Sequence, residues 1–275
     1  MFRADHTVWV VNASTWGWGM DREQLIRRFE LTDRVVVVTG GTRGIGLALA
    51  EGYVAAGAKV VIASRKADAC AEAQRHLEAL GGDALGVPTH LGDLDALDAL
   101  VAATVDRYGR LDVLVNNAAN ALTQPVGQFT VDAYTKSFDV NVRGPVFLSQ
   151  AALPHLIASG HGAILNIVSA GAYLFSGDVS MYSAGKAAMV SFTKSFAAAL
   201  APQGVRVNAM APGPVDTDMV RNNPPEFVDI LARSTLLGRV ADPDEMVGTA
   251  LLLTSDAGSY LTGQVIGVDG GLVPR

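Results

Sequence analysis

The chain contains 275 residues, 49% of them hydrophobic and 17% charged, and its formal net charge at pH 7 is −6. This length and composition allow one domain with a substantial core, and the acidic balance lacks the basic surface that nucleic-acid binding requires. Cys70 is the single cysteine and the five histidines show no metal-ligand spacing, so neither an intramolecular disulfide nor a metal site is expected. No apolar run approaches the roughly 18 residues that span a bilayer, and the N-terminus does not resemble a signal peptide. We therefore expect a cytoplasmic protein without membrane or nucleic-acid partners.

Residues 1–30 are predicted to form an N-terminal extension to a single domain over residues 31–275. All three tryptophans, Trp9, Trp16 and Trp18, fall in this extension. Met20 opens the stretch MDREQLIRRFELTDR, which predicts a short helix leading into the first strand. For residues 1–19 we expect either a misassigned start or a poorly ordered arm, with an oligomer contact as the alternative.

Strand-like and helix-like segments alternate along residues 34–268. Short apolar runs predict strands near 34–39, 58–63, 84–88, 111–115, 162–168, 204–210 and 264–268, and helical patterns lie near 44–57, 67–80, 93–108, 131–158, 181–201 and 243–254. This alternation predicts an α/β fold, a single doubly wound Rossmann-type domain whose seven-stranded parallel sheet is flanked by helices. Right-handed crossovers would place all strand carboxyl ends along one edge, where ligands bind in such sheets.

A glycine-rich turn follows the first predicted strand, in RVVVVTGGTRGIG at residues 34–46. Its spacing is Gly40-x-x-x-Gly44-x-Gly46, and a helical pattern comes directly after it. Glycines let the backbone approach a pyrophosphate, whose charge then lies at the N-terminus of the helix. Taken alone, the triplet also suits a tight turn with close helix packing.

Tyr182 and Lys186 stand four residues apart in YSAGK, downstream of Ser169. On a helix, positions i and i+4 share one face. Moving the pKa of a phenol from about 10 to near 7 requires roughly 4 kcal/mol, and one cation at about 4 Å supplies a similar amount at an effective dielectric near 20. Lys186 could therefore make Tyr182 a proton donor and acceptor near neutral pH. On its own, this spacing usually marks a solvated helix face.

Taken together, these motifs resemble the short-chain dehydrogenase/reductase family, in its subgroup with the compact glycine turn. The resemblance runs from about Leu31 to Gly271. It rests on TGGTRGIG at 39–46, NNAA at 116–119, the asparagine of DVNVRG at 141, NIVSAG around Ser169, YSAGK at 182–186, APGPVDT at 211–217 and VDGG at 268–271. It implies an NAD(P)-dependent oxidoreductase that acts on CH–OH or C=O groups of a small molecule, and a homotetramer.

The resemblance also implies four catalytic residues, Asn141, Ser169, Tyr182 and Lys186. Tyr182 would pass a proton to or from the reacting oxygen, and Ser169 would hold that oxygen in place. Lys186 would lower the pKa of the phenol and bind the nicotinamide ribose. Asn141 would hold a water that connects Lys186 to solvent.

The implied cofactor-binding residues come from the glycine turn, the loops after the next strands, the catalytic helix and the segment after the sixth strand. They are Gly40, Thr42, Arg43, Gly44, Ile45, Gly46, Ser64, Arg65, Leu91, Asn117, Ala118, Tyr182, Lys186, Pro212, Gly213, Val215 and Thr217. Asn117, with its neighbour Asn116, would brace the end of the fourth strand. Pro212, Val215 and Thr217 would position the nicotinamide carboxamide.

The end of the second predicted strand favours NADP(H), with NAD(H) possible. A site that prefers NAD places an acid there for the ribose 2′-hydroxyl. Ser64 occupies that place in this chain, followed by Arg65, and Arg43 lies in the glycine turn. Two guanidinium groups can bind a 2′-phosphate with charge-assisted hydrogen bonds, whereas the alternative is that both arginines only face solvent.

The substrate is less closely defined by the sequence. Residues 219–240 occupy the usual place of a lid, and with Tyr173, Phe175 and Met181 they suggest a hydrophobic ketone or secondary alcohol. We therefore expect an NADPH-dependent carbonyl reductase or secondary-alcohol dehydrogenase. The alternatives are a 3-ketoacyl thioester reductase of the same family and a non-catalytic NADP-binding sensor. An enoyl reductase is disfavoured, because such relatives usually have the lysine where this chain has Met189.

Overall fold

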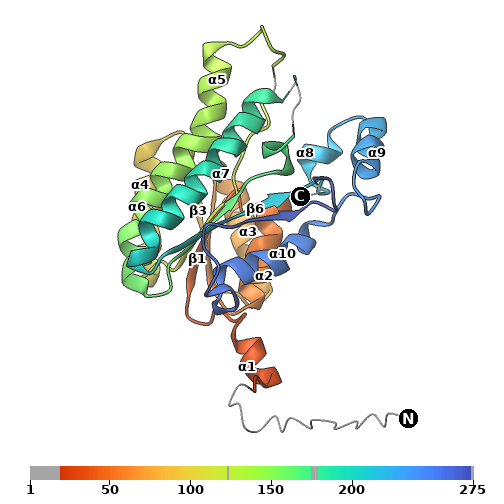
Figure 1. Cartoon of the computed structure of the whole chain (residues 1–275). Coiled ribbons are helices and arrows are strands. Elements are labelled where there is room, and N and C mark those ends of the chain that lie inside the picture. The colour runs from red at the N-terminus through yellow and green to blue at the C-terminus, as the bar shows by residue number, and fades with distance from the viewer. Residues whose placement is uncertain (1–18, 123, 175–176, 178, 274–275) are drawn as a thin grey trace, which may run out of the picture.

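Seven parallel strands form one sheet in the order β3-β2-β1-β4-β5-β6-β7. Figure 1 shows this sheet in a computed structural model that describes residues 19–122, 124–174, 177 and 179–273. This confirms the predicted doubly wound fold. The strands are β1 (Val35–Thr39), β2 (Lys59–Ser64), β3 (Ala84–Pro88), β4 (Val113–Asn116), β5 (Ala163–Ile167), β6 (Arg206–Pro212) and β7 (Val265–Val268). Each lies within about two residues of its predicted position.

Helices cover both faces of the sheet (Figure 1). One layer contains α2 (Gly44–Ala55), α3 (Ala67–Ala79) and α10 (Val247–Thr254), and the other contains α4 (Leu94–Tyr108), α6 (Gly144–Ser159) and α7 (Ser180–Leu200). In β1, Val36 and Val38 pack into the first layer, whereas Val35 and Val37 pack into the second. Because successive strand side chains point to opposite faces, an all-apolar strand of this kind requires a core on each side.

The helix predicted over residues 131–158 is divided into three parts. α5 (Val131–Phe138) ends in a π-helical turn over Asp139–Arg143, and α6 begins at Gly144. Pro145 lacks an N–H group, so the carbonyl of Asn141 loses the donor that an α-helix would supply four residues later. Gly144 also lies so close to Leu91 that a Cβ would overlap the carbonyl oxygen of Leu91. The break therefore follows from one missing donor and one close backbone approach.

Two further helices, α8 (Asp218–Arg221) and α9 (Pro225–Arg233), lie in the segment predicted to act as a lid. Neither has a fully buried residue, and Phe227 and Ile230 of α9 are exposed. Both helices lie beyond the carboxyl ends of the strands, where the loop after β6 leads (Figure 1). The lid therefore packs on the sheet edge and contributes little to the core.

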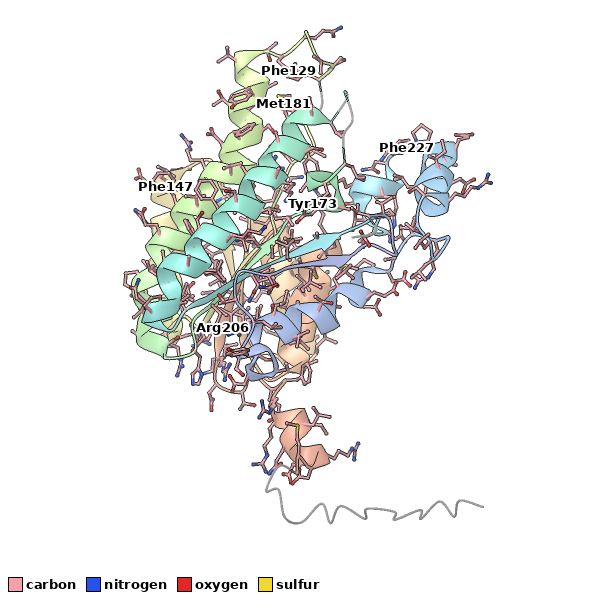
Figure 2. All side chains as sticks on the ribbon, in the orientation of Figure 1. Phe129, Phe147, Tyr173, Met181, Arg206 and Phe227 are labelled. Atoms are coloured by element: carbon pink, nitrogen blue, oxygen red, sulfur yellow. The ribbon has the colours of Figure 1, made fainter. Side chains whose placement is uncertain are left out.

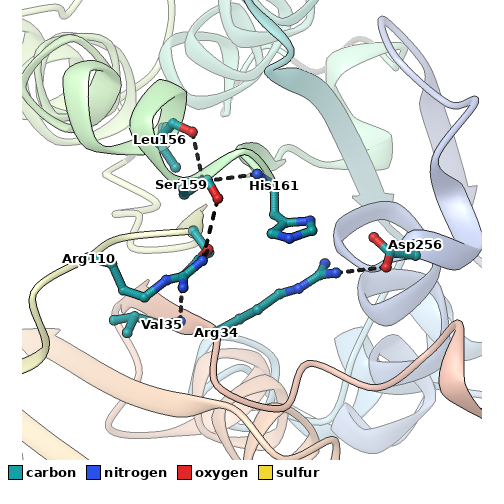
Figure 3. A network of polar contacts seen from close by, with 8 residues as sticks. Arg34, Val35, Arg110, Leu156, Ser159, His161 and Asp256 are labelled. Atoms are coloured by element: carbon teal, nitrogen blue, oxygen red, sulfur yellow. Dashed lines mark hydrogen bonds and ion pairs between the residues drawn. The ribbon is translucent and has the colours of Figure 1, made fainter.

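Ion pairs close the opposite, amino edge of the sheet (Figure 3). Arg34 donates to Asp256 at 2.7 Å, and Arg110 donates to both carboxylate oxygens of Asp112 at 2.6 and 2.8 Å. Asp112 is fully buried and also accepts from the backbone N–H of Val35 at 2.9 Å. A buried carboxylate with these partners ties β1 to the start of β4, which makes this edge a structural one.

The short helix α1 (Arg22–Arg27) precedes the domain and projects from it (Figure 1). A capping box between Asp21 and Gln24 begins the helix, which confirms the short helix predicted after Met20. The predictions for residues 1–18 lie outside the described residues. Of the helices that the structure describes, none combines the length and the apolar character needed to cross a bilayer.

Candidate active site

A cleft of about 630 Å³ runs along the carboxyl edge of the sheet. It begins at the end of β2, passes the glycine turn between β1 and α2, and reaches the start of α7 and the lid. Every residue predicted to bind the cofactor lines it, as do Ser169, Asn120, Ala121, Met219, Val220, Asn222 and Asn223. The topology therefore brings motifs from across the chain to one elongated depression, as expected where strand order reverses between β1 and β4.

The glycine turn gives the cleft a floor of backbone atoms. Gly40 adopts a φ of 66°, a conformation that favours glycine. A Cβ on Gly46 would overlap the carbonyl oxygen of Gly40 and the side-chain amide of Asn117. That amide donates to the carbonyls of Thr39 at 2.8 Å and Gly40 at 3.2 Å, so Asn117 ties the residue after β4 to the glycine turn. A narrow backbone turn at the start of α2 suits the pyrophosphate of a dinucleotide.

Replacing Gly46 by alanine is expected to weaken NADPH binding at least about tenfold and to destabilise the fold by roughly 1–3 kcal/mol, because the new methyl group displaces the turn. Fluorescence titration with NADPH and chemical unfolding measure the two effects. Gly248 on α10 is a matched control, since a Cβ there would meet open space. Gly248→Ala should leave NADPH binding unchanged and stabilise the helix slightly. Equal NADPH affinity in both variants would contradict this account of the turn.

The adenosine end of the cleft contains Ser64 and Arg65 but no carboxylate from α3. Arg65 is exposed, and the hydroxyl of Ser64 accepts from Thr42 at 3.3 Å. Asp68 lies in the first turn of α3 and does not line the cleft. Arg43, predicted to contact a 2′-phosphate, instead pairs with Asp218 of the lid at 2.9 Å. Both side chains of that pair are at least half exposed, so a phosphate could displace the carboxylate at small cost.

Tyr182, Lys186 and Ser169 meet at the other end of the cleft. Ser169 lies two residues after the end of β5, and its hydroxyl accepts from the backbone N–H of Gly171 at 3.0 Å and is hydrogen-bonded to Tyr182. Lys186 is buried, donates to the carbonyl of Ile167 at 2.8 Å, and lies 5.6 Å from the centre of the Tyr182 ring. The structure thus places phenol, hydroxyl and ammonium together, as the i, i+4 spacing predicts.

The pKa values of these groups reflect their burial. Desolvation raises the pKa of Tyr182, and the hydrogen bond from Ser169 offsets part of that rise. Desolvation also lowers the pKa of Lys186 to about 8. Lys186 was expected to lower the pKa of Tyr182, but in the protein without a cofactor that pKa is raised. Without further positive charge in the cleft, the cost of removing the phenolate from water exceeds the attraction of one ammonium.

Asn141 does not line the cleft; it lies behind Asn120, which does. The amide of Asn141 donates to the carbonyl and side-chain oxygens of Asn120 at 2.9 and 3.1 Å, and its oxygen accepts from the N–H of Asn120 at 3.1 Å. Asn120 in turn donates to the carbonyl of Lys136 at 3.0 Å. Sequence reasoning missed Asn120, because no pattern distinguishes it from other loop asparagines.

The expected apolar wall is only partly present. Met219 and Val220 line the cleft, but Tyr173 and Met181 do not, and Phe175 lies outside the described residues. Met181 is buried in the first turn of α7, whereas Tyr173 is partly exposed. Figure 2 shows Tyr173, Met181 and Phe227 at the same end of the molecule as the lid. Asparagines share this part of the cleft with the apolar side chains, so the lining is mixed and not simply hydrophobic.

Comparison with known proteins agrees with this geometry. The chain matches the family described as enoyl-(acyl carrier protein) reductase over residues 40–273. The architecture and the relatives define an NAD(P)-dependent oxidoreductase that acts on alcohol or carbonyl groups. The chain belongs to the short-chain dehydrogenase/reductase family, which confirms the resemblance stated above.

Similar proteins include enzymes for sugar-derived and acyl substrates. Galactitol 2-dehydrogenase of Agrobacterium fabrum is 37% identical, over 88% of this chain and 98% of its own. The 3-oxoacyl-[acyl-carrier-protein] reductase of Synechocystis is 36% identical, over 88% of this chain and 98% of its own. The crystal structure of a gluconate 5-dehydrogenase from Burkholderia cenocepacia J2315, in complex with NADP and tartrate, has a TM-score of 0.86 and 35% identity, with 90% and 98% of the two chains covered.

Proposed function

We propose that this protein is an NADPH-dependent carbonyl reductase that also works in reverse as a secondary-alcohol dehydrogenase. The observation that carries the proposal is the Tyr182 phenol, which is hydrogen-bonded to Ser169 and lies beside the buried Lys186 in the same cleft as the glycine turn. Oxidation of NADPH by a ketone, lost on removal of the Tyr182 hydroxyl, tests it.

The residues of the chain have separate tasks in this reaction. A nicotinamide cofactor bound along the cleft would supply or accept the hydride. The Oη atom of Tyr182 donates a proton to the carbonyl oxygen during reduction and takes one from the alcohol in reverse. Ser169 Oγ holds the same oxygen beside Tyr182. The Lys186 ammonium lies 5.6 Å from the centre of the Tyr182 ring. We assign the proton-supplying water to the carbonyl of Asn141, because the side-chain amide of Asn141 is bonded to Asn120.

The preference for NADPH rests on charge at the adenosine end of the cleft. Arg65 and Arg43 line it there, and the carboxylate that would accept from a ribose 2′-hydroxyl is lacking among the described lining residues near Ser64. The solved gluconate 5-dehydrogenase relative contains NADP, which supports the same preference. NAD(H) remains the alternative cofactor.

Replacing Arg65 by aspartate is expected to raise the KM for NADPH at least about tenfold while sparing NADH, because a charge-assisted contact worth roughly 1.5–3 kcal/mol becomes a repulsion. Steady-state kinetics with each cofactor measure the change. Arg75→Asp on the exposed face of α3 is a control with the same change in charge. If Arg65→Asp affects NADPH and NADH equally, the assignment of Arg65 to the 2′-phosphate is wrong.

Two alternative functions are a 3-ketoacyl thioester reductase and a non-catalytic NADP-binding sensor. The Synechocystis relative favours a 3-ketoacyl thioester reductase. An acidic carrier protein would need basic residues beside the cleft, and the stretches AALPHLIASGHG and FAAALAPQG contain no lysine or arginine. The smaller thioester of coenzyme A avoids that requirement. A non-catalytic NADP-binding sensor would not need the complete set of Ser169, Tyr182 and Lys186, so turnover distinguishes it from an enzyme.

Membership of the family also supports a homotetramer located in the cytoplasm. Residues 1–30 would form an N-terminal extension that does not belong to the catalytic domain over residues 31–275. Tyr134 of α5 and Phe147 and Ile157 of α6 are apolar and at least one-third exposed, which suits a helix-to-helix contact between copies. Light scattering of the purified protein should give the mass of four chains, and the mass of one chain would refute the contact.

A further inference from the structure

The substrate end of the cleft differs in charge from the cofactor end. Among the described residues that line the cleft, the cations are Arg43, Arg65 and Lys186. Arg65 and Arg43 lie at the adenosine end, where both are assigned to the 2′-phosphate of the cofactor, and the Lys186 ammonium donates to the Ile167 carbonyl. No described lining residue therefore offers a cation to a carboxylate of the substrate.

Two of the three arginines in the lid over residues 219–240, Arg221 and Arg239, are held in ion pairs, and the third, Arg233 at the end of α9, does not line the cleft. Arg221 binds both carboxylate oxygens of Asp216, at 2.6 and 2.8 Å. Arg239 binds both oxygens of Glu245, at 2.6 and 2.7 Å, and holds the pKa of that carboxyl down to about 2. A substrate carboxylate inside the cleft would therefore lose water without gaining an ionic partner from the described lining residues, which is unfavourable.

Three asparagines give this end its polarity, and two of them are committed to the protein. Asn120 is bonded to Asn141 and to the carbonyl of Lys136. Asn223 donates to the carbonyls of Met219 and Val220 at 2.8 and 3.1 Å, which closes the end of α8. Asn222 lines the cleft and is exposed, and its amide makes no hydrogen bond to any other residue that the structure describes. It is thus an available donor and acceptor beside Met219 and Val220.

We infer that the physiological substrate is an uncharged, polyhydroxylated carbonyl compound or its alcohol, and that Asn222 determines this specificity by hydrogen-bonding a substrate hydroxyl. The inference rests on the proposed function and narrows it to one substrate class. An amide can donate to one hydroxyl oxygen and accept from the same or a neighbouring hydroxyl. A site built to bond a hydroxyl discriminates strongly against an analogue without it. Aldonates and other carboxylates are correspondingly poor substrates.

The test uses the intact protein with NADP⁺ and three sets of alcohols: neutral hexitols, the corresponding hexonates, and a secondary hexanol without further hydroxyls. We expect kcat/KM for the best hexitol to exceed that for the best hexonate at least about tenfold. Asn222→Ala should lower kcat/KM about tenfold more for the hexitol than for the hexanol, which is the effect of one hydrogen bond of about 1.4 kcal/mol. Asn223→Ala, which removes a bond within α8, should affect both substrates alike.

The possible outcomes distinguish a failure of the assigned substrate class from a failure of the proposed oxidoreductase function. Equal or better turnover of hexonates, preference for the plain hexanol, or an equal effect of Asn222→Ala on both alcohols would overturn the inference while the enzyme remains an alcohol dehydrogenase. Absence of turnover with every alcohol and ketone, while NADPH still binds, would contradict the proposed function and the inference with it.

Discussion

Tyr182→Phe is expected to lower kcat for carbonyl reduction by roughly 10²–10⁴-fold, the usual contribution of a positioned general acid. The substitution removes only the hydroxyl that bonds to Ser169, and the ring beside Lys186 remains. NADPH affinity should change little, because the cleft extends from α7 to the end of β2 and most of its lining is untouched. Single-turnover oxidation of bound NADPH separates this loss of chemistry from a loss of binding.

Tyr260→Phe provides the matched control. Tyr260 is fully exposed and does not line the cleft, so the same change there should leave kcat unaltered. If Tyr182→Phe keeps more than about one-tenth of the wild-type rate, another group donates the proton, and the assignment of Tyr182 as the acid fails.

Lys186→Met is expected to abolish most turnover and yet to stabilise the cofactor-free protein at pH 7. Lys186 is buried, and its pKa falls from 10.5 to about 8 because burial penalises the ammonium. That fall corresponds to about 3 kcal/mol of unfavourable free energy at pH 7. Methionine fills a similar space without charge, although the Ile167 carbonyl loses a donor at a cost of about 1 kcal/mol. We therefore expect a net gain of about 2 kcal/mol in the free energy of unfolding.

The stability advantage of Lys186→Met over the wild type should depend on pH. Below pH 8 the ammonium is present in both the folded and the unfolded wild-type chain, and the folded state carries the full desolvation penalty. Between pH 8 and 10.5 the unfolded chain binds more protons than the folded one, so the Lys186 contribution to stability rises with pH. The advantage of Lys186→Met over the wild type should therefore shrink across that window.

Urea unfolding at pH 7 and at pH 10 gives the free energy of unfolding of the wild type and of Lys186→Met. Subtracting one from the other at each pH cancels the contributions of other groups that titrate at high pH. A variant less stable than the wild type at both pH values would show that the ammonium is held favourably and that its burial carries no penalty. Loss of turnover together with gain of stability would mark Lys186 as a residue kept for its chemistry.

The sheet and the cleft could be predicted from the sequence because their signals are local. Runs such as Val35–Thr39 alternate with helical patterns, and parallel topology then places every strand end at one edge. The i, i+4 geometry placed Tyr182 beside Lys186 for the same reason. The break near Gly144 was not predicted, although Pro145 was a signal for it. α8 and α9 were missed because they are short and pack little apolar surface.

Contacts between distant loops were beyond sequence reasoning. The pair between Arg43 and Asp218 joins residues far apart in the chain, and nothing in either local sequence indicates the partner. The hydrogen bond between the side chains of Asn120 and Asn141 likewise joins two segments whose local sequences do not indicate each other. The raised pKa of Tyr182 was also missed, because the i, i+4 spacing indicates the attraction of Lys186, whereas the desolvation of both groups depends on packing that the local sequence does not show.

The most direct measurement is the decrease in the absorbance of reduced nicotinamide when the protein is mixed with NADPH and a panel of neutral ketoses, simple ketones and ketoacyl-CoA thioesters. NADH and Tyr182→Phe are run in parallel. We expect NADPH oxidation with at least one carbonyl compound, slower oxidation of NADH, and oxidation slowed roughly 10²–10⁴-fold in the variant. Undiminished turnover by Tyr182→Phe, or silence across the panel with NADPH bound, would contradict it.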